Sequence, residues 1–113
     1  MYLHYYNWFF RFLFPYRTWG KKTDDQVIYL TFDDGPIPEV TEFVLDELKK
    51  HEAKATFFCV GDNIRKYPAV YSRLLKEGHR SGNHTYNHLK GTQCALGEYA
   101  DNVSKCDPVS YTH

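Results

Sequence analysis

The sequence lacks the cysteine pairs that stabilise small extracellular domains. It contains three cysteines, Cys59, Cys94 and Cys106, an odd number with no Cys-x-x-Cys spacing. A disulfide framework needs an even set, and a zinc ribbon or a thioredoxin-like redox motif needs a close pair. Cys59 stands in an apolar run, which indicates a thiol packed in the core. The cysteines therefore argue against a disulfide-stabilised scaffold and favour a reducing compartment.

The chain also lacks an excess of charge of either sign. Lys and Arg number 14, as do Asp and Glu, so the formal net charge is +0. Proteins that bind nucleic acid draw much of their affinity from clustered positive charge. The balance argues against a nucleic-acid partner and is compatible with a neutral sugar polymer.

Long apolar runs and a small-residue cleavage site are absent as well, so neither a membrane-spanning helix nor a signal peptide is expected. The sequence leaves two locations open, the cytoplasm and the periphery of a membrane. A hydrophobic fraction of 42% in 113 residues is enough for the core of one domain at most.

Aromatic residues crowd the first 25 positions, which end in a polar linker into the first predicted strand. Three interpretations are open: the segment packs against the domain as a cap, it lies at a membrane surface, or it is disordered or a wrongly assigned start. The aromatic residues are Tyr2, Tyr5, Tyr6, Trp8, Phe9, Phe10, Phe12, Phe14, Tyr16 and Trp19.

From residue 26 onward, short apolar runs alternate with amphipathic segments. Buried parallel strands read as apolar runs, whereas surface helices repeat apolar residues every three to four positions. The alternation predicts an α/β domain with a parallel sheet. Strands are expected at 26–32, 54–60 and 79–83, and helices at 38–50, 67–77 and 96–105.

Each predicted helix has one apolar face that should point into the core. The first strand is expected to be buried. The core positions of the first two helices are predicted to be Val40, Val44, Leu45 and Leu48, followed by Val70, Leu74 and Leu75.

Two short motifs carry the chemistry. Residues 31–36 read Thr-Phe-Asp-Asp-Gly-Pro, and residues 84–88 read His-Thr-Tyr-Asn-His. One carboxylate and two imidazoles are a common ligand set for a catalytic divalent metal, and they leave a further position open for water. Each motif alone is weak, because Asp-Asp-Gly-Pro is an ordinary turn and two histidines can be surface residues. The combination is much stronger.

The two aspartates should do different work. Neighbouring side chains on a strand point to opposite faces, so Asp33 and Asp34 are not expected to ligate the same ion. Gly35 and Pro36 turn the chain at the carboxyl end of the strand, where α/β folds place their chemistry. His84 and His88 can converge either on a helix or in a loop.

These motifs resemble those of the polysaccharide deacetylase family, the NodB-homology or carbohydrate esterase type. Residues 31–36 resemble its first motif, and residues 84–88 resemble its His-[Ser/Thr]-x-x-His motif. Residues 54–61, Lys-Ala-Thr-Phe-Phe-Cys-Val-Gly, resemble the second core strand. Residues 78–83, Gly-His-Arg-Ser-Gly-Asn, resemble the approach to the histidines. The resemblance covers residues 26–106.

The resemblance implies a distorted (β/α) barrel and a role for each matched residue. Asp33 would be the catalytic base, and Asp34, His84 and His88 the metal ligands, with Zn²⁺ as the expected ion. The implied activity is hydrolysis of acetyl groups on a polysaccharide, with N-acetyl groups of an amino-sugar polymer favoured over O-acetyl esters. The other function class is a non-catalytic half-domain that binds metal or glycan.

The family's later motifs, including the histidine that acts as general acid, have no counterpart in this sequence. A (β/α) barrel needs about twice this length, so we expect residues 26–106 to be the first half of the domain, inactive on its own. Residues 107–113 are expected to be a non-native tail.

The remaining histidines and two asparagines are given lesser roles. His51 and His79 are predicted to be surface or helix-end residues rather than ligands. Asn83 and Asn87 flank the histidine motif. They either hydrogen-bond the loop, orient an imidazole, or are simple turn residues.

Overall fold

The computed structural model describes residues 12–16 and 26–111. The three interpretations of the aromatic N-terminus thus fall largely outside the described residues. Within 12–16, Phe12 is 76% exposed and Tyr16 is 100% exposed. None of the helices in the described part of the chain is long and apolar enough to cross a membrane.

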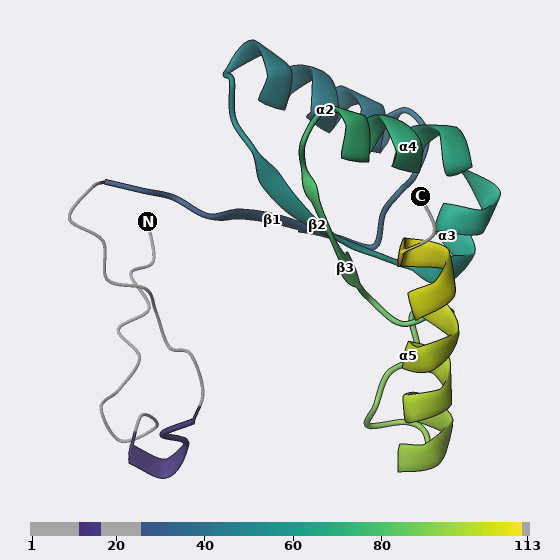
Figure 1. The fold of residues 1–113 in the computed structure, drawn as a ribbon. Coiled ribbons are helices and arrows are strands. Elements are labelled where there is room, and N and C mark those ends of the chain that lie inside the picture. Colours follow the sequence, from purple (N-terminus) through teal and green to yellow (C-terminus); the bar gives the residue numbers. More distant parts are fainter. Residues whose placement is uncertain (1–11, 17–25, 112–113) are drawn as a thin grey trace.

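Three parallel strands form one sheet in the order β1–β2–β3 (Figure 1). Helices α2 and α4 lie together over one face of this sheet, and α5 stands beyond the carboxyl ends of the strands. The predicted α/β class with parallel strands is confirmed. The elements are β1 (Leu30–Asp33), α2 (Val40–Lys50), β2 (Ala55–Cys59), α3 (Gly61–Lys66), α4 (Pro68–Lys76), β3 (Arg80–Asn83) and α5 (Leu96–Tyr111).

The core lies between the sheet and the helices. Alternate residues of β2 are buried, as expected for a strand with one face packed against helices. Phe57 at its centre is 3% exposed and stacks on Phe32 of β1, with ring centroids 5.1 Å apart. Full burial of such a side chain contributes about 1.5–3 kcal/mol. The core residues are Leu45, Leu48, Ala55, Phe57, Cys59, Ile64, Tyr71 and Leu74. Cys59 is therefore a core thiol, as predicted.

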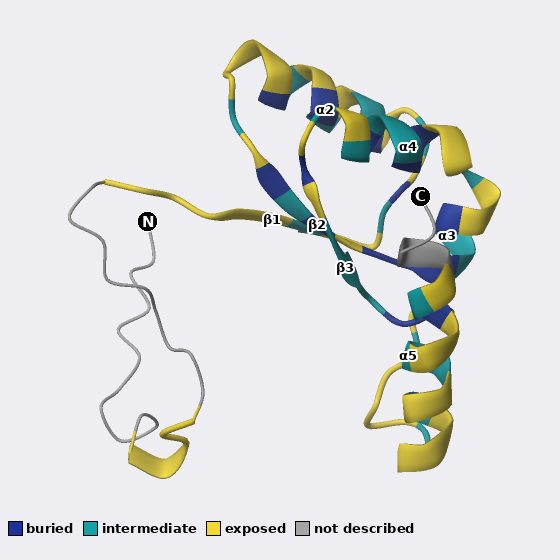
Figure 2. Ribbon diagram, in the orientation of Figure 1, coloured by how far each residue is buried: buried dark blue, intermediate teal, exposed yellow. Residues whose placement is uncertain are grey.

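The predicted burial of the first strand is wrong. The strand begins at Leu30 rather than at residue 26, Leu30 is 40% exposed, and Ile28 before it is 84% exposed (Figure 2). The reason is that β1 is an edge strand of the described sheet, and the described helices cover one face only. Val40, predicted to be in the core, is 63% exposed, whereas Leu45 and Leu48 of the same helix are buried.

One helix was not predicted. α3 begins shortly after the end of β2, and it is too short for its apolar residues to show a helical period. Its buried residues are Gly61 and Ile64. Its first turn carries Asp62, which pairs with Arg65 (3.2 Å) and with Lys66 (2.5 Å). An acid at the start and bases at the end stabilise a short helix. α5 also extends beyond the predicted end at residue 105, to Tyr111.

His79, predicted to be a surface or helix-end residue, is buried. Its side chain is 6% exposed and packs edge-on against Phe57, with centroids 5.5 Å apart. Its Nδ1 accepts a hydrogen bond from the Ala55 N–H at the start of β2 (3.2 Å). Burial lowers the pKa of this imidazole, and the nearby positive charge of Lys54 lowers it further, while Glu77 opposes the shift.

The lowered pKa predicts a loss of stability in acid. Because His79 takes up a proton more readily in the unfolded chain, stability should fall as pH drops below about 6.5, the value of an unperturbed histidine, towards the folded-state pKa. His79→Asn places an acceptor near the Nδ1 position but does not titrate. Thermal unfolding measured from pH 7.5 to 5 should show a larger loss for the wild type than for this variant. Identical pH profiles would contradict the prediction.

Candidate metal centre

Asp34 lies directly after the last residue of β1, in a loop held on two sides. The Val60 N–H donates to the Gly35 carbonyl (2.8 Å), which ties the loop to the end of β2. Asn63 of α3 donates from Nδ2 to the Asp34 carbonyl (2.8 Å). Asp34 itself has a φ of 68°, in the left-handed region that non-glycine residues rarely adopt. The surrounding bonds therefore maintain an unfavourable backbone conformation at this residue.

The two histidines lie in the loop between β3 and α5, not on a helix. His84 donates from its N–H to the Cys59 carbonyl (3.0 Å), at the carboxyl edge of the sheet. Thr85 and His88 then turn the chain, with φ values of 63° and 55°. The Thr85 Oγ1 accepts from the Leu89 N–H (2.9 Å) and closes the turn. This path returns His88 to the same side of the loop as His84.

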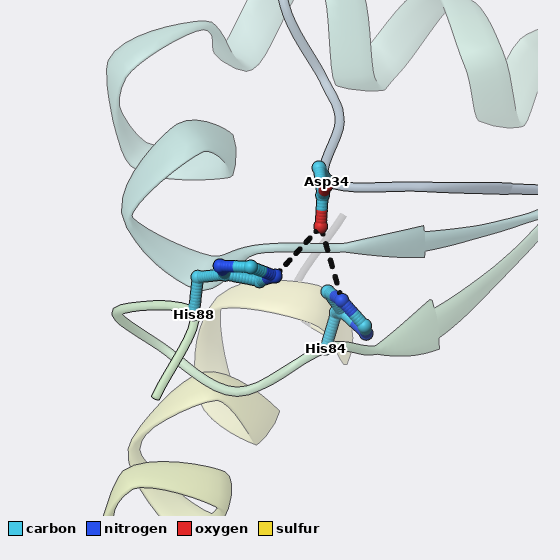
Figure 3. Close-up of side chains that lie close together, drawn as sticks. All are labelled: Asp34, His84 and His88. Carbon is cyan, nitrogen blue, oxygen red and sulfur yellow. Dashed lines mark ion pairs between the residues drawn. The ribbon is translucent and has the colours of Figure 1, made fainter. Parts of the chain in front are cut away.

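Asp34, His84 and His88 converge on one point (Figure 3). The Asp34 Oδ1 lies 3.1 Å from the His84 Nε2 and 2.9 Å from the His88 Nε2. All three donor atoms lie within 4.8 Å of one another. The side chains are 59%, 32% and 51% exposed, in the order Asp34, His84, His88. The structure thus brings the three predicted ligands together at a point that is open to solvent.

This donor set fits a divalent metal ion. Two imidazole nitrogens and one carboxylate oxygen form a three-ligand set typical of catalytic zinc. Donors about 2.0–2.2 Å from a tetrahedral ion lie roughly 3.3–3.6 Å apart, a few tenths of an ångström more than the distances of 3.1 and 2.9 Å from the Asp34 Oδ1 to the two imidazoles. Left-handed φ values at Asp34, Thr85 and His88 cost about 1–2 kcal/mol each. Backbone strain of this kind is found mainly at functional sites.

Asp33 lies outside this group. It is the last residue of β1, it pairs with Phe58, and its side chain is exposed. Phe32, on the opposite face of the strand, packs against the core. Pleating therefore turns Asp33 to the face of β1 opposite Phe32, away from the helices. Asp33 is left near the strand end without a place among the three converging donors.

Two asparagines that sequence reasoning did not single out support the site. Asn63 holds the Asp34 carbonyl, and Asn102 of α5 bonds the histidine loop. The sequence indicated a special role for them only through their position within helices, because asparagine is a poor helix former. Three roles were open for Asn83 and Asn87, and both form hydrogen bonds in the loop that carries the histidines. The Asn83 Oδ1 accepts from the Thr85 N–H (2.8 Å), and the Asn87 Oδ1 accepts from the Asn102 Nδ2 (3.1 Å).

A hollow of about 650 Å³ borders the histidines on the side of α5. Its lining includes both histidines, Lys90 of the following loop, and Tyr99 and Val103 of the helix. The candidate centre is therefore accessible from solvent along a surface that α5 helps to shape.

Comparisons with known proteins identify relatives of this chain. A sequence profile of the family described as "Polysaccharide deacetylase" matches residues 20–109. A peptidoglycan-N-acetylglucosamine deacetylase of Bacillus cereus is 47% identical over 74 residues, which are 66% of this chain and 35% of that protein. The matched part of the chain spans 35% of this relative's length, 40% of a chitooligosaccharide deacetylase of Bradyrhizobium and 16% of a peptidoglycan-N-acetylmuramic acid deacetylase of Bacillus subtilis.

Solved structures show the same fold. The structure of the peptidoglycan deacetylase PdaC from Bacillus subtilis superimposes with a TM-score of 0.73 at 39% identity, over 77% of this chain and 43% of that one. A family 4 acetyl xylan esterase from Clostridium thermocellum, solved in complex with a cobalt ion, superimposes with a TM-score of 0.67 at 32% identity, over 73% of this chain and 40% of that one.

Proposed function

This chain belongs to the polysaccharide deacetylase family, and from that premise we propose that it supplies the metal ligands and the base of an enzyme that removes N-acetyl groups from an amino-sugar polymer. The observation that carries the proposal is the convergence of Asp34, His84 and His88 at the open carboxyl edge of the sheet. The relatives named as peptidoglycan-N-acetylglucosamine and peptidoglycan-N-acetylmuramic acid deacetylases support a polymer that contains one of these N-acetylated sugars over an O-acetylated one.

In the proposed mechanism Asp34, His84 and His88 hold a divalent ion, with Zn²⁺ preferred. When bound, zinc would lower the pKa of water to about 7 and polarise a carbonyl oxygen. The two imidazoles offer their Nε2 lone pairs and must be neutral to do so. The solvent-exposed side of the three ligands leaves room for the acetyl group.

Asp33 acts in this proposal as the general base. Its carboxylate accepts the proton of the attacking water as the acetyl carbonyl is attacked, a role that typically contributes 10²–10⁴-fold to the rate. The amide nitrogen of the sugar must gain a proton as it leaves. We expect the general acid to come from a part of the protein beyond the matched motifs. The 113 residues on their own are therefore proposed to be inactive.

Acetate release tests the proposal. The full-length protein, incubated with N-acetylated chito-oligosaccharides or with peptidoglycan, should release acetate. Treatment with a chelator should abolish the release, and added zinc should restore it. The 113-residue chain alone should give none. Zinc binding without acetate release from either substrate by the full-length protein would instead indicate a binding module.

A further inference from the structure

The histidine loop is anchored differently at its two ends. Its first half is tied to neighbouring backbone: the His84 N–H donates to the Cys59 carbonyl (3.0 Å), and the Gly61 N–H donates to the Thr85 carbonyl (3.0 Å). The second half carries His88, and it is held by one backbone bond from α3, in which the Asp62 N–H donates to the Tyr86 carbonyl (2.9 Å), by a bond from the Tyr86 N–H to the Asn102 carbonyl (3.2 Å), and by side chains. His88 is also the more exposed of the two imidazoles, at 51% against 32% for His84. The position of His88 thus depends in part on side-chain contacts, which a substitution can remove.

Asn102 supplies most of the side-chain contacts to that second half. Its Oδ1 accepts from two consecutive backbone donors, the Tyr86 N–H (2.7 Å) and the Asn87 N–H (3.0 Å). Its Nδ2 donates to the Asn87 Oδ1 (3.1 Å). One side chain from α5 therefore adds a hydrogen bond to each of the 85–86 and 86–87 peptide planes, whose carbonyls accept from the backbone of α3. An asparagine within a helix is disfavoured, so these bonds offset a local cost in α5.

The backbone of His88 needs such support. Its φ of 55° is unfavourable for a residue with a side chain. Its Nε2 nevertheless points at the Asp34 Oδ1 from 2.9 Å. If the preceding peptide planes were held less firmly, the residue could relax towards negative φ and the imidazole would leave the donor set. The Thr85–Leu89 bond closes the turn, and within it the bonds from the Asn102 side chain add to the backbone bond between the Asp62 N–H and the Tyr86 carbonyl (2.9 Å).

We propose that Asn102 is a positioning residue for metal binding, which acts through residues 86 and 87 on His88. The inference rests on the proposed metal site and adds a dependence on α5 that the ligands alone do not imply. Loss of hydrogen bonds that orient metal ligands typically weakens metal affinity 10–100-fold.

The test compares zinc affinity in three variants of the full-length protein. Asn102→Ala should weaken zinc binding about 10–100-fold, while α5 stays intact because alanine is the better helix former. Asn102→Asp keeps an oxygen that can accept from both N–H groups and should recover most of the affinity. Ser104→Ala, an exposed position on the same helix, is the control and should bind like the wild type. Melting temperatures identify any variant that fails to fold.

Two NMR readouts separate positioning from general stability. In Asn102→Ala the imidazole signals of His88 should shift while those of His84 stay in place. In the wild type the Tyr86 and Asn87 amides should exchange slowly with solvent. Wild-type affinity in Asn102→Ala would overturn the inference, as would equal losses in the folded Ala and Asp variants. If Asn102→Ala does not fold, rapid exchange of both wild-type amides would overturn it. A wild type that binds no zinc would refute the proposed metal site itself.

Discussion

Replacing His88 with alanine is expected to eliminate stoichiometric zinc binding by the full-length protein. The reason is that the site offers three converging donors, and removal of one leaves a bidentate site. The loss should exceed the 10–100-fold typical of supporting residues, so affinity should fall by more than about 100-fold. Isothermal titration and metal analysis of the purified protein measure it. Acetate release should fall together with the zinc content.

His51→Ala is the matched control for that experiment. His51 is an exposed histidine at the end of α2, so this variant makes the same chemical change outside the site. It should bind zinc as the wild type does. Full zinc occupancy in the folded His88→Ala variant would remove His88 from the ligand set.

The two aspartates should separate metal binding from catalysis. Asp33→Ala is expected to keep its zinc and lose about 10²–10⁴-fold in acetate release, the usual contribution of a general base. Asp34→Ala should lose zinc and activity together, because Asp34 faces both imidazoles. Zinc content and acetate release, measured on the same preparations of the full-length protein, give both quantities.

The result that would contradict this division of labour is equal loss of zinc in the two variants. Such a result would place both carboxylates on the ion. Activity that survives Asp33→Ala at full zinc content would instead assign the base to another residue. Both variants change exposed residues, so neither is expected to disturb the core.

Part of this fold could be predicted because its signals are local. Apolar runs and proline–glycine punctuation located three strands and three of the helices, although β1 starts later than predicted and α5 ends well beyond residue 105. Leu45 and Leu48 were placed correctly in the core. The prediction failed where burial depends on partners: β1 reads as a buried strand, yet it lies at an edge of the described sheet. His79 was assigned to the surface, since no local pattern reveals that it bonds the first residue of β2.

The candidate site, like the fold, could be predicted only in part. The motifs identified Asp34, His84 and His88, and the structure brings them together. The supporting groups were not predictable, because Asn63 and Asn102 act across 29 and 15 residues of sequence. The left-handed conformations of Thr85 and His88 also arise from tertiary contacts rather than from residue type. The motifs therefore identified the candidate ligands, whereas the residues that contact the two ligand loops could be identified only from the structure.

X-ray absorption at the zinc edge of the full-length protein tests the central claim most directly. The spectrum reports the type and number of atoms bound to the metal. Ligation by Asp34, His84 and His88 predicts two imidazoles, with the remaining ligands oxygen atoms at about 2.0–2.2 Å. Sulfur at about 2.3 Å, fewer than two imidazoles, or a protein that retains no zinc would contradict it.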